Sequence, residues 1–154
     1  MKSLILIGWA TVALAWMFSA QAAELNAETM ASFLPSAMSG YTKDSDAIEN
    51  TRPDEGIWAG ARYDGATTFI LQIQKSTPAA ENMLALVERF SQSERPINIV
   101  DINGVGFIML GGECFTALAG DVVVSCSNFD PDVQAHLETI DFDDLSALAV
   151  GARK

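Results

Sequence analysis

The chain has 154 residues, of which 20 are acidic, 9 are basic and one is histidine, and its formal net charge is −11. This length is typical of one domain. Such an acidic surface repels nucleic-acid phosphates and anionic lipids, so we expect neither as a partner. The charge also favours a soluble protein, which we expect to be a monomer.

The first 22 residues have the features of an export signal. Residues 4–18 form an uncharged apolar stretch after Lys2, and residues 19–22 end in the small-x-small pattern that signal peptidases cleave. An uncleaved membrane anchor is the alternative, but the stretch is shorter than the roughly 20 residues that a spanning helix needs. The sequence therefore predicts a periplasmic or secreted protein, with a single domain at residues 23–154 and no membrane span after cleavage.

The two cysteines are Cys114 and Cys126. In an exported protein an even number of cysteines favours a disulfide. Predicted strands at 113–118 and 122–127, joined by a three-residue loop, place these cysteines directly opposite each other. A two-residue loop would shift the register by one and turn them to opposite faces. We predict a structural disulfide without a redox role, because the spacing is not C-x-x-C.

The first third of the domain contains one helix and one hairpin. Asn26 has the character of an N-cap, and Pro35 ends the helix that follows it. Residues 36–56 are polar and rich in turn residues, with a short edge strand predicted at 46–51. Strands at 57–63 and 67–75 are joined by an Asp64-Gly65 turn, and the odd-numbered side chains of the second strand are expected to be buried.

A second helix is predicted to begin with Thr77 as N-cap and Pro78 at its first position, and to end before Pro96. Its apolar side chains recur with helical spacing and should pack on a sheet. They are Met83, Leu86, Val87 and Phe90.

In the second half of the domain the sequence predicts an antiparallel meander followed by helices. Strands at 97–102, 105–110, 113–118 and 122–127 are separated by hairpin-length connections. A helix beginning at Asp130-Pro131 turns Val133, Leu137 and Ile140 inward, and a last helix covers 142–150. The predicted fold class is α+β, with an antiparallel sheet (hairpin plus four-strand meander) covered by two to three helices.

This order of elements resembles small secreted bacterial α+β proteins of the Mog1/PsbP-like kind. Two short motifs carry the resemblance: the opening from Leu34-Pro35 to Gly40-Tyr41, and the closing segment 140–145. The resemblance implies an accessory or binding module. It carries over no catalytic residue to this chain.

The single histidine, His136, does not indicate a catalytic or metal site. A serine triad would require a G-x-S-x-G turn, and a zinc site would require further histidine or cysteine ligands. We expect His136 to be a half-buried or surface side chain of its helix.

The acidic clusters do not predict a metal site either. Asn128, Asp130 and Asp132 alternate as in a calcium loop, but Val133 and Thr139 stand where that loop needs glycine and a carboxylate. Asp130 and Asp132 fit a helix N-terminus better, as do the aspartates at 141–144. The acidic residues between 44 and 55 leave open a weak cation site or a solvated loop. The sequence predicts no cofactor.

The first hairpin carries the candidate binding residues. Trp58 and Arg62 share one strand face and Tyr63 lies on the other, so the three form a possible partner or ligand surface. The alternative for Trp58 is core packing under a helix. We therefore predict a binding or accessory module, without enzymatic activity, for a protein or small-molecule partner. A carboxylate-based hydrolase and an envelope-associated structural protein are the alternatives.

Overall fold

The computed structural model describes residues 25–44, 56–91 and 97–151. Their helices and strands are, in chain order, α1 (Ala27–Ala31), β1 (Thr42–Asp44), β2 (Ile57–Asp64), β3 (Thr68–Lys75), α2 (Thr77–Ser91), β4 (Asn98–Ile102), β5 (Val105–Leu110), β6 (Glu113–Leu118), β7 (Val122–Cys126), α3 (Pro131–Leu137) and α4 (Phe142–Ala149). Within the described ranges, no helix has the length and apolar character needed to span a membrane.

The strands form one seven-stranded antiparallel sheet in the order β1-β2-β3-β7-β6-β5-β4. The predicted hairpin and the predicted meander are both present. They form a single sheet because β3 pairs with β7, which places Ile73 opposite Val124. The α+β prediction is confirmed. The edge strands of the sheet are β1 and β4, and the strand predicted at 46–51 lies outside the described residues.

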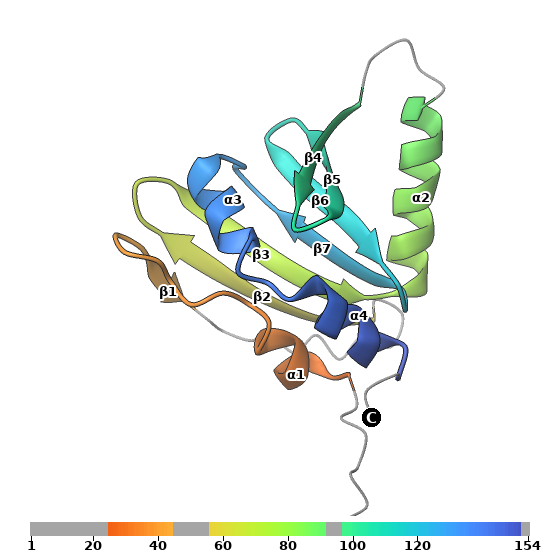
Figure 1. Ribbon diagram of the computed structural model, residues 1–154, viewed down its shortest axis with the longest axis horizontal. Coiled ribbons are helices and arrows are strands. Elements are labelled where there is room, and N and C mark those ends of the chain that lie inside the picture. Colours follow the sequence, from red (N-terminus) through yellow and green to blue (C-terminus); the bar gives the residue numbers. More distant parts are fainter. Residues whose placement is uncertain (1–24, 45–55, 92–96, 152–154) are drawn as a thin grey trace, which may run out of the picture.

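One face of the sheet forms the main core. Alternate side chains of the strands, among them Phe69, Leu71 and Val124, are fully buried there. Three helices cover this face, and Figure 1 shows α1, α3 and α4 grouped over one side of the sheet. The fourth helix, α2, packs on the other face through Met83, which contacts Val123 of β7. The sheet therefore has a fully covered face and a partly covered one.

The helix starts follow the predictions, with one correction. Asn26 caps α1, as predicted. The predicted cap of α2, Thr77, is wrong by one residue: Ser76 occupies the capping position, and its Oγ accepts the Ala79 N–H at 3.4 Å. The Thr77 hydroxyl instead donates to Asp121 at 2.7 Å. This bond ties the start of α2 to the β6–β7 turn, a contact that local sequence does not indicate.

The predicted disulfide is confirmed together with its register. Leu118 lies opposite Val122, and Cys114 lies opposite Cys126. Their Cα atoms are 5.0 Å apart and their sulfurs are bonded. The three-residue turn therefore sets the register that the bond requires.

The prediction for His136 is wrong, because its side chain is fully buried. Its Nε2 accepts the Met38 N–H at 3.3 Å, so Nδ1 carries the proton that it donates to the Asp132 carbonyl at 2.7 Å. Three aromatic rings surround the imidazole, with centroids 4.9–5.2 Å away: Tyr41, Tyr63 and Phe69. Burial is tolerated because both ring nitrogens are hydrogen-bonded. His136 therefore joins α3 to the sheet and to the segment after α1.

Candidate functional site

The partly covered face of the sheet is hollowed over β2, β3, β7 and β6. Two adjoining hollows lie there, of about 310 Å³ and about 220 Å³, and both are lined by Ile70 and Gln72. The first also involves Asp44, Trp58, Gly60, Ala61 and Arg62, and the second Glu113, Cys114, Phe115, Ser125, Cys126 and Ser127. We call this surface the open face. Because Ile70 and Gln72 line both hollows, the two lie side by side across the strands, and we call them together the groove.

Trp58 forms part of the groove floor. The neighbouring Gly60 has no side chain, and a Cβ atom built there would lie 3.7 Å from Cζ3 of the Trp58 ring. The indole therefore extends over the glycine, along its own strand, and stays half-buried. The predicted alternative, core packing under a helix, is not what the structure shows, because α2 packs on β6 and β7 instead.

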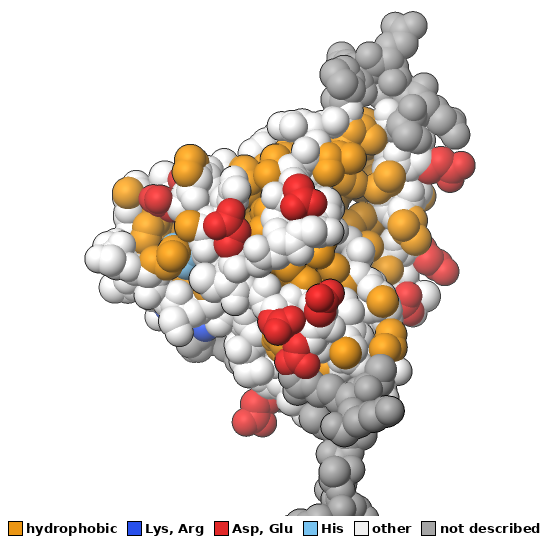
Figure 2. Space-filling model, in the orientation of Figure 1, with side chains coloured by type: hydrophobic (Ala, Val, Ile, Leu, Met, Phe, Trp, Pro, Cys, Tyr) orange, Lys and Arg blue, Asp and Glu red, His pale blue; other side chains and the backbone are white. Residues whose placement is uncertain are grey.

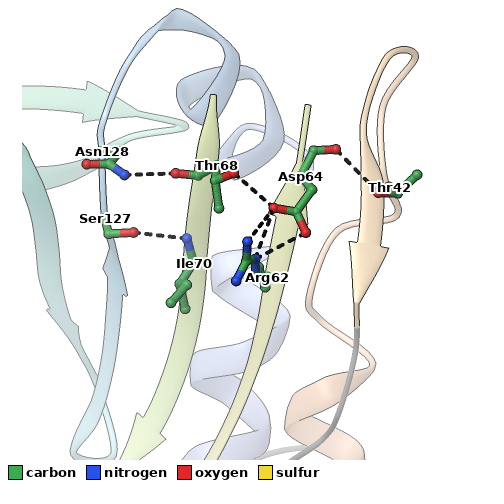
Figure 3. A network of polar contacts seen from close by, with 7 residues as sticks. All are labelled: Thr42, Arg62, Asp64, Thr68, Ile70, Ser127 and Asn128. Atoms are coloured by element: carbon green, nitrogen blue, oxygen red, sulfur yellow. Dashed lines mark hydrogen bonds and ion pairs between the residues drawn. The ribbon is translucent and has the colours of Figure 1, made fainter. Parts of the chain in front are cut away.

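Arg62 is held by an acidic side chain of its own strand. Its Nε lies 3.0 and 3.1 Å from the two carboxylate oxygens of Asp64, and its Nη2 lies 2.9 Å from Asp64 Oδ1 (Figure 3). The Thr68 hydroxyl donates to the same carboxylate at 2.9 Å. These hydrogen bonds, from Thr68 first and then from Arg62, lower the pKa of Asp64. The charge of Arg62 is thus compensated within the protein.

The ladder arranges the groove in cross-strand rows. Asp44 pairs with Arg62, and Arg62 pairs with Ile70. The Ile70 N–H donates to the Ser127 hydroxyl at 3.0 Å (Figure 3). The Ser127 N–H donates in turn to the Ile70 carbonyl at 3.1 Å. The β6–β7 register extends this row to Glu113. A carboxylate therefore ends the row on each side of an exposed isoleucine.

Tyr63 does not belong to this surface, which corrects the predicted grouping. It is fully buried on the core face, where its hydroxyl donates to the Pro35 carbonyl at 2.7 Å. Its ring stacks on Phe69 with a centroid distance of 4.8 Å. Burial raises the pKa of Tyr63. The alternation of β2 separates Tyr63 from Trp58 and Arg62, because odd and even positions face opposite sides.

Two of the acidic side chains at the helix starts, those of Asp130 and Asp141, serve as caps. Asp130 accepts the Val133 N–H at 2.9 Å and the Thr67 hydroxyl at 2.8 Å. Asp141 accepts the Asp144 N–H at 2.8 Å. Asp132 accepts the Tyr41 hydroxyl at 2.8 Å. The predicted position of Asp130 and Asp141 at helix N-termini is confirmed, and both side chains cap their helices.

A third hollow, of about 330 Å³, lies between the β4–β5 turn and the α3–α4 connection. Its carboxylates are those of Glu138, Asp141 and Asp143. Asp141 is engaged as a cap, and Glu138 accepts a hydrogen bond from Gln134 at 2.9 Å. Among the described residues no group of three or more metal-ligating side chains is placed to hold an ion. The acidic residues from 46 to 55 lie outside the described ranges.

Several groove residues were missed in the sequence because they depend on strand pairing. Ile70 did carry a local signal, since it is an isoleucine on the polar side of its strand, between Thr68 and Gln72. Asp44 and Glu113 carried none. They meet the groove only because β1 and β6 lie on opposite sides of the β2–β3–β7 unit.

The protein surface is predominantly acidic. Figure 2 shows acidic side chains at several places on the face it presents, and few basic ones.

In the comparisons with known proteins, no family model, no curated protein and no solved structure matches this chain. The Mog1/PsbP-like relationship therefore stays a prediction.

Proposed function

We propose that this protein is an exported, non-enzymatic binding module that holds its partner or ligand in the groove of the open face. One observation carries the proposal: the groove has an apolar floor of Trp58 and Ile70, and Ile70 is 49% exposed. Arg62 stands beside them with its head group fixed by Asp64. Tryptophan and arginine, placed together in a hollow, are the residues that most often anchor a binding partner.

The disulfide supports the exported location. Bonds of this kind form and persist in oxidising compartments such as the periplasm and the extracellular space. Cys114 and Cys126 are bonded in this fold, and residues 1–22 have the sequence of an export signal. A Mog1/PsbP-like accessory role fits the same proposal.

Two described carboxyl groups have pKa values that do not suit a general acid of a carboxylate-based hydrolase. A general acid needs a carboxyl group whose pKa is raised. Among the described residues, the carboxyl groups of Asp64 and Asp130 have clearly shifted pKa values, and both are lowered. For Asp130 burial acts to raise the pKa, but hydrogen bonds from Val133, Thr67 and Asp132 outweigh it. Both groups are therefore shifted in the direction opposite to that of a general acid.

Thermal unfolding of the purified protein with a panel of peptides, sugars, amino acids, lipids and divalent cations tests this proposal. A ligand at about 100 times its dissociation constant should add roughly 2.7 kcal/mol, or several degrees in Tm. The shift should vanish in Trp58→Ala and persist in Leu84→Ala. Leu84 is the matched control because it is 61% exposed on α2. A shift that is equal in Trp58→Ala and in the parent would remove the open face from consideration.

A further inference from the structure

The groove has the dimensions of an extended chain molecule. The row from Asp44 to Glu113 crosses β1, β2, β3, β7 and β6. Four interstrand spacings of about 4.8 Å give a length of about 19 Å. An extended peptide of seven residues covers six steps of roughly 3.3 Å, which is about 20 Å. A peptide of that length can therefore reach both ends of the row.

The charges along the row favour a cationic occupant. The carboxylates of Asp44 and Glu113 lie at the two ends of the row, and the Asp64 carboxylate lies next to the row, paired with the guanidinium of Arg62. Arg62 and Asp64 compensate each other at 2.9 Å, so one uncompensated carboxylate remains at each end. Electrostatic complementarity selects the partner and suppresses competitors of the wrong sign.

Two further described cations, Lys43 and Lys75, do not offset these carboxylates. The ammonium groups of Lys43 and Lys75 donate to backbone carbonyls, those of Leu34 at 3.0 Å and Ala149 at 3.1 Å. Leu34 and Ala149 belong to the main core, which lies on the other side of the sheet. The groove thus faces solvent with a net negative charge.

Between its acidic ends the groove carries three apolar side chains beside the polar Gln72. Ile70 and the half-buried rings of Trp58 and Phe115 line it between the two acidic ends. Trp58 can contact an aliphatic side chain and can also attract a cation with the face of its ring. An occupant with apolar side chains in the middle and cations at its ends matches this order.

Resting on the proposed function, we infer that the groove binds an extended, cationic polypeptide segment. Its basic side chains lie at Asp44 and at Glu113, and its apolar side chains lie on Trp58, Ile70 and Phe115. In an extended peptide alternate side chains point to the same side. The sequence Lys-Thr-Leu-Thr-Leu-Thr-Lys therefore turns both lysines and both leucines toward the groove.

Fluorescence of Trp58 reports on this binding directly. The chain has three tryptophans, and Trp9 and Trp16 lie in the segment predicted to be removed on export. The protein purified from the exported fraction is titrated with the acetylated and amidated peptide and, separately, with the matched peptide that has glutamate in place of both lysines. The variant Trp58→Phe, titrated in the same way, gives the change in fluorescence that does not come from Trp58. We expect the basic peptide to change the Trp58 emission and to bind at least about ten-fold more tightly than the acidic one. High salt should reduce this difference.

Charge variants test the assignment of the two ends. The double variant Asp44→Asn, Glu113→Gln should bind the basic peptide about ten-fold more weakly than the parent does. The matched control removes two exposed carboxylates elsewhere, by Glu28→Gln in α1 with Asp143→Asn in α4, and should change affinity less than about two-fold. Equal binding of both peptides, or equal loss in both double variants, would overturn the inference.

Failure of the inference can be told apart from failure of the proposed function. If neither peptide binds while another ligand of the panel both stabilises the protein and changes the Trp58 emission, the open face is a binding surface for a different chemistry. If stabilising ligands leave the Trp58 emission unchanged, the proposed function itself is wrong.

Discussion

His136 shows how a single side chain connects distant parts of this fold. Its two ring nitrogens bond the backbone of Met38 and of Asp132, and Tyr41 packs against its ring. The sequence predicted His136 to be a half-buried or surface side chain of its helix. It could not show the acceptor and donor groups that make complete burial possible, because Met38 lies 98 positions away in the chain.

Replacement of His136 by alanine should be strongly destabilising. It removes a fully buried ring and leaves the Met38 N–H without its acceptor. We expect the free energy of unfolding to fall by about 3 kcal/mol, from the cavity and the unsatisfied donor together. Urea denaturation measures this. Gln134→Ala on the same helix is the control and should cost at most about 0.5 kcal/mol. A loss below about 1 kcal/mol for His136→Ala would contradict the structural role.

Asp130 should make the stability depend on pH in the acid range. Its pKa is lowered in the folded protein from the ordinary value of 3.8, so the unfolded chain takes up the proton first as pH falls. The contribution of the carboxylate is complete above that ordinary value and is lost as pH falls through the lowered one. Asp130→Ala should cost about 1 kcal/mol at neutral pH, as for a lost helix cap. Urea denaturation at several pH values should show that cost shrinking toward pH 3. A constant or growing cost would count against the account.

At the scale of elements, local sequence predicted most of the fold. The bounds of β5 and β6 agree with the prediction, because alternation and turn glycines define each strand without help from the rest of the chain. The pairing of β3 with β7 was not predicted. Those strands are about 50 residues apart in the sequence. No local pattern shows which strand of the hairpin pairs with which strand of the meander. The groove depends on this pairing, since it brings Ser127 to Ile70.

The disulfide should act as a staple between β6 and β7. The two cysteines are 12 positions apart. Closing a loop of this length stabilises a protein by roughly 3 kcal/mol in the chain-entropy model. Cys114→Ala with Cys126→Ala should therefore lower the free energy of unfolding by about that amount. A reductant should destabilise the parent and leave the double variant unchanged. Parent and variant of equal stability under oxidising conditions would exclude the bond.

The β6–β7 turn and the end of α4 fit together at Gly120. This glycine has φ +77°, and a Cβ atom there would come within 2.8 Å of the Ala149 Cβ. Gly120→Ala combines an unfavourable backbone angle with a steric clash, and we expect a loss of about 2 kcal/mol or more in thermal or urea unfolding. Gly104→Ala has a similar φ, +79°, but nothing within 4 Å. It should cost clearly less, and equal costs would show that the contact with α4 is unimportant.

At the scale of the whole molecule, the acidic charge and the groove belong to one account. The sequence offered Trp58 and Arg62, together with Tyr63, as a partner or ligand surface, with core packing as the alternative for Trp58, and it gave the excess of acidic side chains as a surface property. It could not connect them, because Asp44 and Glu113 approach the groove only through the order of the strands. The same alternation that buries Tyr63 exposes Trp58, so a one-residue change of register in β2 would remove the surface altogether.

The most direct test of the open face as the binding surface is chemical-shift mapping of backbone amides during titration with the ligand that most raises Tm. The account predicts that the perturbed amides cluster on β2, β3 and β7, around Trp58, Ile70 and Gln72. It also predicts that the chemical shifts of the amides of α3 and α4, on the covered side of the sheet, do not change. Perturbations that centre on α3 and α4 while those of the groove residues are unchanged would contradict it.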